Sequence, residues 1–285
     1  MKLSIIITSW NTERLLRACL TSIQQFPPQC SFETIVVDNA SKDGSSAMVR
    51  SEFPSVILID HPNNSGYAGG NNIGYAKSSG EYILLLGSDT EVTENAVQRM
   101  LDHLDSRKDA GMVSCRLEYP NGDIQRSCKR FPTVLNAVAM YCSLHFLNTN
   151  YLMNEFDHLS VLEIDQPDAT CVMIRREALG PFIFDEQYSI LYNDVDLCQR
   201  VKRKGWKIVF IPDAVVIHHG SQSTKQAPQN VRLVMYQNIL RYYRSYFGMY
   251  AQFILAPILF IRYTAATRSM NGFSLFYSMT KGSLS

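Results

Sequence analysis

Tyr82-Ile83-Leu84-Leu85-Leu86-Gly87-Ser88-Asp89-Thr90 is the stretch that decides the fold. A short apolar run bounded by turn residues predicts a strand buried on both faces, as in a parallel sheet. The run ends abruptly in small polar residues and one carboxylate. Ligands bind just beyond the carboxyl ends of strands in open α/β sheets, so Asp89 is a candidate ligand or metal residue. The alternative is that Asp89 starts a turn or caps the helix expected over 94–105.

Helical patterns alternate with further strands around this stretch. Strands are expected over 3–9, 32–37, 55–59 and 112–117. This alternation predicts βαβ units and a mostly parallel sheet over about the first 117 residues, which makes the protein α/β. Polar side chains gather where the strands end, at Asn11, Asp38, Asn39, Asn64 and Asp89. Several such residues on one edge of a parallel sheet favour a ligand site over a set of unrelated turns.

Two nucleotide-binding signatures are missing. The first turn, Ser9-Trp10-Asn11-Thr12, is not glycine-rich, which disfavours a dinucleotide dehydrogenase. The chain has no G-x-x-x-x-G-K-[ST] motif, which disfavours a P-loop NTPase.

Composition narrows the class of protein further. A chain of 285 residues with 46% hydrophobic and 19% charged residues can bury a large core. The net charge is +1 and there is no long basic block, so nucleic acid is not an expected partner. Seven cysteines without a C-x-x-C pair argue against a disulfide framework or zinc site and indicate a reducing compartment. No signal peptide is expected, because the sequence starts directly with a strand.

The C-terminal part has a different charge balance. Seven Lys and Arg residues and no acidic residue follow Asp213, which predicts an anionic partner such as a membrane surface. The apolar run 253–261 is short and contains Pro257, so a transmembrane helix is not expected. A core helix and an interfacial helix both remain open for this run.

Two more groups of residues carry chemistry. Asp194 and Asp196 lie near the start of a predicted helix, and carboxylates two apart do not share a helix face. One of them therefore caps the helix while the other faces a cleft. Two short strands are expected over 206–211 and 214–217. They lead to His218 and His219, which are either metal-ligand candidates or structural residues. Residues 120–166 show no clean period, which favours a loop-rich lid or variable insertion.

Taken together, these residues resemble the inverting family 2 glycosyltransferases with the GT-A fold, in particular the bacterial rhamnosyltransferase-like members. The match runs in order along residues 2–224. Its pieces are Ile6-Ile7-Thr8-Ser9-Trp10-Asn11, Val36-Val37-Asp38-Asn39-Ala40-Ser41-Lys42-Asp43-Gly44, Asn64-Ser65-Gly66 with Gly69-Gly70-Asn71-Asn72, Ser88-Asp89-Thr90, Asn193-Asp194-Val195-Asp196-Leu197-Cys198, and His218 with Gly220 and Ser223.

The resemblance implies a role for each of these residues. Asp194 would be the general base, and Asp89 with His218 would bind Mg²⁺ or Mn²⁺. Asp38 would contact the base of a nucleotide-sugar donor. The expected pocket for nucleotide and sugar comprises Thr8, Ser9, Asn11, Asp38, Asn39, Asn64, Gly66, Gly70, Asn71 and Ser88. Two positions depart from the family pattern: Gly87 stands where the D-x-D motif has its first carboxylate, and Asn193 stands where a Glu often precedes the base.

The resemblance also implies the overall function. The expected reaction moves a sugar, from dTDP-rhamnose or a UDP-sugar, to a glycan or lipid-linked acceptor in bacterial surface polysaccharide synthesis. There are two alternative functions. One is a catalytically silent module that binds a sugar nucleotide or glycan. The other is a nucleotidyltransferase, which would require a basic, Gly-rich loop after the first strand, and this sequence lacks such a loop.

The expected division places the glycosyltransferase domain in 1–224. Residues 1–117 would form its nucleotide-sugar half and 118–224 its acceptor half, followed by a helical extension over 225–285. The expected location is the cytoplasm, peripherally on the inner face of the plasma membrane.

Overall fold

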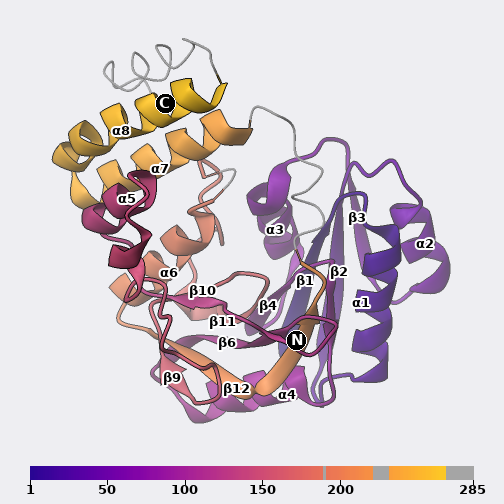
Figure 1. Cartoon of the computed structure of the whole chain (residues 1–285). Helices are drawn as coiled ribbons and strands as arrows, with labels where there is room; N and C mark the ends of the chain where they lie inside the picture. The colour runs from indigo at the N-terminus through magenta and orange to yellow at the C-terminus, as the bar shows by residue number, and fades with distance from the viewer. Residues whose placement is uncertain (189–190, 221–230, 268–285) are drawn as a thin grey trace.

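A central sheet organises the molecule, which is a computed structural model that describes residues 1–188, 191–220 and 231–267 (Figure 1). Four parallel strands form its first half in the spatial order β3-β2-β1-β4. Their bounds are β1 Leu3–Ser9, β2 Phe32–Asn39, β3 Ile57–His61 and β4 Tyr82–Leu86. The strand predicted over 82–86 is completely buried, which confirms the expectation for it.

The second half of the sheet continues with β11, β6, β12 and β5. Their bounds are β5 Thr90–Val92, β6 Ala110–Glu118, β11 Cys171–Arg175 and β12 Lys207–His218. β11 runs antiparallel between β4 and β6, and β12 runs parallel to β6. The sequence predicts two short strands over 206–217, and that prediction is wrong. Pro212 and Asp213 lie in an irregularity within one strand, where the register shifts between Ile211 and Val215.

Helices cover both faces of the sheet. α1 (Glu13–Gln25), α2 (Ser45–Glu52) and α4 (Ala96–Ser106) pack with the odd-numbered residues of β1 in one apolar core. α3 (Gly66–Lys77) and α6 (Asn193–Arg203) pack with Ile6 in a second core on the other face. The mostly parallel sheet between two helix layers confirms the predicted α/β class.

The chain between β6 and β11 is built from short pieces, in agreement with the irregular insertion expected there. It comprises β7 Ile124–Gln125, β8 Cys128–Lys129, α5 Val134–Tyr141, a 3₁₀ turn His145–Asn148, β9 Leu162–Glu163 and β10 Gln166–Pro167. β8 and β10 pair with each other in a separate two-stranded sheet. A 3₁₀ turn, Arg176–Ala178, follows β11.

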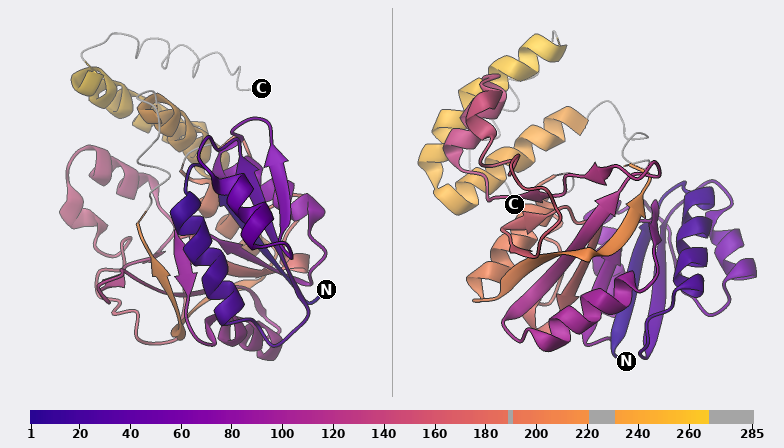
Figure 2. Two further views of the ribbon diagram at one scale, coloured as in Figure 1. Left: turned by 90° about the vertical axis from the view of Figure 1, so that its right-hand side faces the viewer. Right: turned by 60° about the horizontal axis from the view of Figure 1, so that its bottom comes forward.

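Two C-terminal helices form a hairpin, α7 (Val231–Phe247) and α8 (Met249–Thr267), with Gly248 at φ +86° in the turn. Both pack with α5 around a third core, on the side of the molecule away from α1 and α2 (Figure 2). The predicted helical extension begins at residue 225, which lies outside the described residues. No helix in the described ranges is long and apolar enough to cross a membrane.

The helix α8 has two apolar faces. Ala251, Leu255 and Leu259 are buried against the neighbouring helices. The opposite face exposes large apolar side chains, namely Met249, Tyr250, Phe253, Ile254 and Ile261. The sequence leaves a core helix and an interfacial helix as alternatives for this run. One face of α8 is part of the core, and the other face is exposed and apolar, as an interfacial helix would require.

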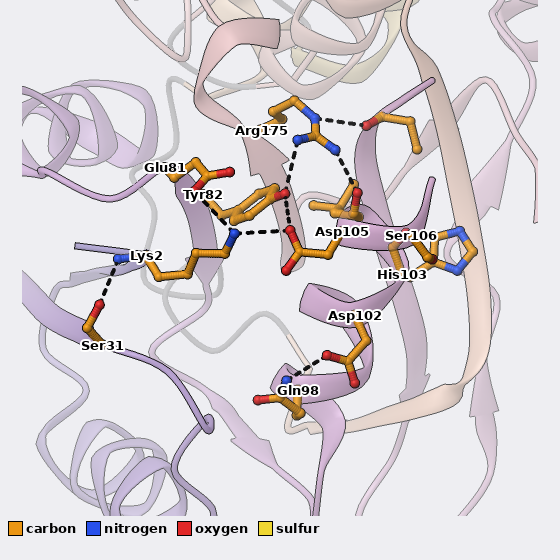
Figure 3. A network of polar contacts seen from close by, with 12 residues as sticks. Lys2, Ser31, Glu81, Tyr82, Gln98, Asp102, His103, Asp105, Ser106 and Arg175 are labelled. Atoms are coloured by element: carbon orange, nitrogen blue, oxygen red, sulfur yellow. Dashed lines mark hydrogen bonds and ion pairs between the residues drawn. The ribbon is translucent and has the colours of Figure 1, made fainter. Parts of the chain in front are cut away.

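A polar network closes the amino-terminal end of β4, opposite the strand ends that carry Asp89 (Figure 3). The Tyr82 hydroxyl donates to Asp105 Oδ1 at 2.6 Å and accepts from Arg175 Nη1 at 3.0 Å. Lys2 Nζ lies 3.0 Å from the same Asp105 oxygen, and Arg175 Nη2 donates to the Leu104 carbonyl at 2.6 Å. Burial raises the pKa of Tyr82 to about 12, so this hydroxyl keeps its proton. The network joins Lys2, just before β1, to β4, β11 and α4.

Candidate active site

Two buried polar atoms at the ends of β1 and β2 have no hydrogen-bond partner within the part of the chain that the structure describes. They are Thr8 Oγ1 and Asp38 Oδ1. The other oxygen of Asp38 accepts from the Ser41 amide at 2.9 Å, so the carboxylate is oriented by its own turn. Buried polar groups are nearly always paired in folded proteins. A polar ligand could pair with both atoms, which belong to two of the predicted pocket residues on neighbouring strands.

α3 packs closely against the ends of the same two strands. A Cβ at Gly70 would come within 2.9 Å of Thr8 Oγ1 and 3.0 Å of Asn39 Nδ2, so only glycine fits there. Asn39 accepts from the Ser65 hydroxyl and donates to the Gly66 carbonyl, both at 2.9 Å. The predicted pocket residues Asn39, Gly66 and Gly70 therefore meet, with the Asn39 side chain holding the loop that begins α3.

Most of the other predicted pocket residues make hydrogen bonds that order loops. Asn11 accepts from the Lys42 amide at 2.7 Å, which ties the first turn to the loop after β2. Asn64 Oδ1 accepts from the Gly66 amide, and Asn71 Nδ2 donates to the Tyr67 carbonyl.

Three hydroxyls connect the first turn to the end of β4. Thr12 Oγ1 lies 2.9 Å from Ser9 Oγ and donates to Ser88 Oγ at 3.1 Å. All three residues are buried. The predicted pocket residues Ser9 and Ser88 thus lie on either side of Thr12, and the hydroxyls fix the backbone just before Asp89.

Asp89 and His218 lie side by side, as the sequence predicts for a metal pair. β5 and β12 pair with His218 opposite Thr90, and the His219 amide donates to the Asp89 carbonyl at 2.9 Å. His218 Nε2 is 3.5 Å from Asp89 Oδ2, and both side chains are buried. The neighbouring His219 instead contacts Glu91 Oε1, at 2.7 Å.

These two side chains fit a divalent cation. An imidazole nitrogen and a carboxylate oxygen that face each other at 3.5 Å are both metal-ligand atoms. No third His, Cys, Asp or Glu completes a group with them in the described ranges, so a cation held here would need further oxygen ligands from other sources. A Cβ at Gly87 would lie 3.0 Å from Asp89 Oδ1, so the glycine removes a side chain next to this pair.

α6 separates the two candidate base residues by environment. Asp196 is buried, with one oxygen 2.8 Å from Arg200 Nε and the other accepting from the Tyr246 hydroxyl at 2.6 Å. Asp194 is only partly buried, and its Oδ1 accepts from the Val195 amide at 2.8 Å. Asp196 therefore links α6 to α7 through Tyr246. The Oδ1 atom of Asp194 bonds to the backbone, which leaves Oδ2 as the candidate oxygen to contact a substrate.

The surroundings of Asp194 favour a proton acceptor. Burial raises the pKa of Asp194 above its ordinary value, and the negative charge of Asp168 raises that pKa further. A carboxylate with a raised pKa is a stronger base. Leu191 and Tyr192, just before α6, both adopt positive φ, at 62° and 66°. Such strained backbone is common at functional sites.

Some residues of the site were not predicted from the sequence. Gln125 contacts His218 twice, and Tyr67 donates to the Ala169 carbonyl at 2.8 Å, which links α3 to the start of β11. The Pro120-Asn121-Gly122-Asp123 turn was a readable hairpin signal that would have placed Gln125 on a strand. No sequence signal marks Tyr67 or Tyr246, because their partners lie 102 and 50 residues away.

The sequence is similar to a known protein family and to several characterised relatives. The sequence profile described as glycosyl transferase family 2 matches residues 4–180. The chain is 26% identical over 211 residues to N-acetylglucosaminyl-diphospho-decaprenol L-rhamnosyltransferase of Mycobacterium tuberculosis, a match that covers 68% of each protein. It is 28% identical over 240 residues to the O-antigen biosynthesis protein RfbC of Myxococcus xanthus, covering 79% of this chain and 18% of that much longer relative.

A solved structure shares the fold. The mannosyltransferase PcManGT from Pyrobaculum calidifontis, in complex with GDP-Man and Mn²⁺, matches with a TM-score of 0.56 at 17% identity. The match covers 100% of this chain and 81% of that one, and it confirms the predicted GT-A fold. The matched profile covers more than half of the 285 residues. The chain therefore belongs to glycosyl transferase family 2.

Proposed function

We propose that the chain transfers a sugar from dTDP-rhamnose or a UDP-sugar to a glycan or lipid-linked acceptor, with inversion, in bacterial surface polysaccharide synthesis. One observation carries the proposal: Arg200 and Tyr246 each contact one oxygen of the buried Asp196, whereas Asp194 is partly exposed and has a raised pKa. A catalytically silent binding module has no need to set these two carboxylates apart. The relatedness to a rhamnosyltransferase supports the choice of donor class.

The steps follow from the chain's own residues. Thr8 and Asp38 would bind the nucleotide through their unpaired oxygens, with Asn11, Asn39, Asn64, Gly66, Gly70, Asn71, Ser9 and Ser88 shaping the pocket. Asp194 would take the proton from the acceptor hydroxyl as that oxygen attacks the anomeric carbon from the face opposite the leaving group. One displacement of this kind inverts the anomeric configuration.

Asp89 and His218 would hold Mg²⁺ or Mn²⁺, which neutralises the charge that develops on the departing nucleoside diphosphate. We predict that Asp89→Ala abolishes turnover and that a chelator does the same to the unaltered protein. The chelated protein should recover when Mn²⁺ is added in excess, while Asp89→Ala should not. Full turnover in excess chelator would contradict this assignment.

Release of nucleoside diphosphate from a panel of nucleotide sugars, with a lipid-linked glycan acceptor, tests the proposal as a whole. A donor present at 100 times its Kd stabilises the folded protein by about 2.7 kcal/mol, so thermal unfolding can select the donor first. Stabilisation by a donor without any turnover would favour the silent binding module instead.

We further propose that the protein is cytoplasmic and lies on the inner face of the plasma membrane. The acid-free segment after Asp213 and the exposed apolar face of α8 support this location. The division at residues 224 and 225 into a glycosyltransferase domain and a helical extension is likewise proposed, and it falls outside the described residues.

A further inference from the structure

A single side-chain amide contacts His218 at two points. Gln125 Nε2 lies 2.7 Å from the main-chain oxygen of His218, and Gln125 Oε1 lies 2.8 Å from the ring nitrogen Nδ1. A main-chain carbonyl oxygen only accepts hydrogen bonds, so the nitrogen end of the amide must face it. The orientation of the amide is therefore fixed by the backbone rather than by the imidazole.

The state of the imidazole follows from that orientation. The amide oxygen of Gln125 can only accept, so Nδ1 of His218 must carry a proton to donate to it. In the neutral ring the lone pair is then on Nε2, the nitrogen that faces Asp89 Oδ2 at 3.5 Å. Two acceptors face each other across this gap, which is the arrangement that a cation between them would stabilise.

Strand pairing holds both partners of this contact. Gln125 belongs to β7 and pairs with Leu117 of β6, and the hairpin closes through the Tyr119 amide and the Asp123 carbonyl at 2.8 Å. β12, which ends at His218, pairs with β6 along the same stretch, where Val216 lies opposite Leu117. The amide and the imidazole thus project from two strands fixed to a common third strand.

We infer that Gln125 is a positioning residue for metal binding: it holds the His218 ring in the tautomer that presents Nε2 to a divalent cation shared with Asp89. This inference rests on the proposed metal role of Asp89 and His218. Metal-ligating histidines generally depend on a partner at the other ring nitrogen, and loss of such a partner typically weakens metal affinity by about 10- to 100-fold.

The test uses the full chain with Gln125→Leu, Gln125→Glu, His218→Ala and the double variant Gln125→Leu/His218→Ala. Long-range ¹H–¹⁵N NMR of the metal-free proteins reports the tautomer of His218, assigned by its loss in His218→Ala. Mn²⁺ titration followed by electron paramagnetic resonance gives the metal affinity, and circular dichroism confirms that each variant is folded.

Unaltered protein should show a proton on Nδ1 of His218. Gln125→Leu should give a mixture of tautomers and an affinity for Mn²⁺ lower by about 10- to 100-fold. Gln125→Glu keeps the acceptor and should keep the tautomer. In the His218→Ala background, Gln125→Leu should change the Mn²⁺ affinity no further.

An unchanged tautomer in Gln125→Leu would overturn the inference, as would an equal loss of Mn²⁺ affinity with and without His218. The absence of Mn²⁺ binding by the unaltered chain would also overturn it. None of these readouts depends on turnover. A failure of the proposed glycosyl transfer would appear separately, as a missing release of nucleoside diphosphate.

Discussion

Asp194 and Asp196 differ in what surrounds them, although only Val195 separates them in the chain. Asp196 contacts Arg200 and Tyr246 with its two oxygens, whereas Asp194 Oδ1 accepts from the Val195 amide. The sequence predicts that one of them caps the helix and the other faces a cleft, and the resemblance selects Asp194 for the cleft. The structure adds a physical reason: both oxygens of the other carboxylate already have partners within the protein. The predicted cap is wrong, because Tyr192 is the N-cap residue of α6 and no side chain caps the helix.

We therefore predict opposite outcomes for two matched substitutions. Asp194→Asn should lower turnover by about 10² to 10⁴, because a general base is lost, and should leave donor affinity nearly unchanged. It should not lower the Tm at pH 7, because the raised pKa of Asp194 means that its charged form costs stability there.

Asp196→Asn should retain most turnover and lose about 1.5–3 kcal/mol of stability, because its charge-assisted hydrogen bonds weaken. To decide which residue is the general base, turnover, donor affinity and thermal unfolding should be measured for both variants side by side. If Asp196→Asn is the inactive enzyme and Asp194→Asn is active, the roles must be exchanged.

The negative charge of Asp168 should affect how the activity depends on pH. Burial and Asp168 both raise the pKa of Asp194, so the base becomes protonated at a higher pH than an ordinary Asp would. Activity should fall as the pH drops through that raised pKa. Asp168→Asn should lower the pKa and so move the acid limb of the pH profile of kcat to lower pH.

Asp157→Asn, at an exposed carboxylate not among the charges that raise the pKa of Asp194, is the matched control and should leave the profile in place. A profile that is the same in Asp168→Asn and in unaltered protein would show that the limb belongs to another group.

At the scale of elements, α7 acts as a support for α6. The Tyr246 hydroxyl donates to Asp196, and Gln199 Nε2 lies 3.2 Å from the Tyr242 hydroxyl. The ring centroids of Tyr242 and Tyr192 are 4.7 Å apart, with the rings tilted by 38°. Tyr192 immediately precedes α6. The C-terminal hairpin thus contacts the helix that carries the candidate base at its start and along its side.

Tyr246→Phe tests this support. Burial and the charge of Asp196 raise the pKa of Tyr246, so its hydroxyl is a donor at every physiological pH. Its loss leaves a buried carboxylate oxygen unpaired and should cost about 1.5–3 kcal/mol in the free energy of unfolding. Tyr250→Phe, in the exposed part of α8, should cost almost nothing. Equal losses in urea unfolding for the two variants would mean that the bond to Asp196 contributes nothing specific.

The sequence predicts the elements whose signals are local. The buried run 82–86 and the strand 3–9 agree with β4 and β1 because continuous apolar residues and turn residues mark them. The sequence does not show that β11 runs antiparallel between β4 and β6, since strand direction depends on contacts between distant segments. For the same reason Gln125 was missed, because its partner His218 is 93 residues away.

At the scale of the whole molecule, the exposed face of α8 lies on the outside of the C-terminal hairpin. Phe253 is 68% exposed and Ile261 is 63% exposed, while Leu255 between them is fully buried. Deletion of α8 would therefore expose the third core as well as remove the proposed membrane contact. Point substitutions on the exposed face separate these two effects.

We predict that Phe253→Ser/Ile261→Ser no longer floats with vesicles that contain phosphatidylglycerol, while unaltered protein does. Each buried side chain of this size contributes about 1.5–3 kcal/mol, so the loss of two is large. Ile57→Ser, at an exposed apolar residue on the edge strand β3, is the control and should float normally. Equal flotation of all three proteins would remove the membrane role from α8.

The antiparallel direction of β11 has a consequence for how such proteins diversify. β6 ends and β11 begins at the same edge of the sheet, where the strands are neighbours, so the chain between Glu118 and Cys171 leaves and returns at almost one place. Lengthening such a connection costs little entropy. The length and sequence of this stretch, and of its packing partner, the α7–α8 hairpin, can therefore vary while the parallel strands β3-β2-β1-β4 keep their register.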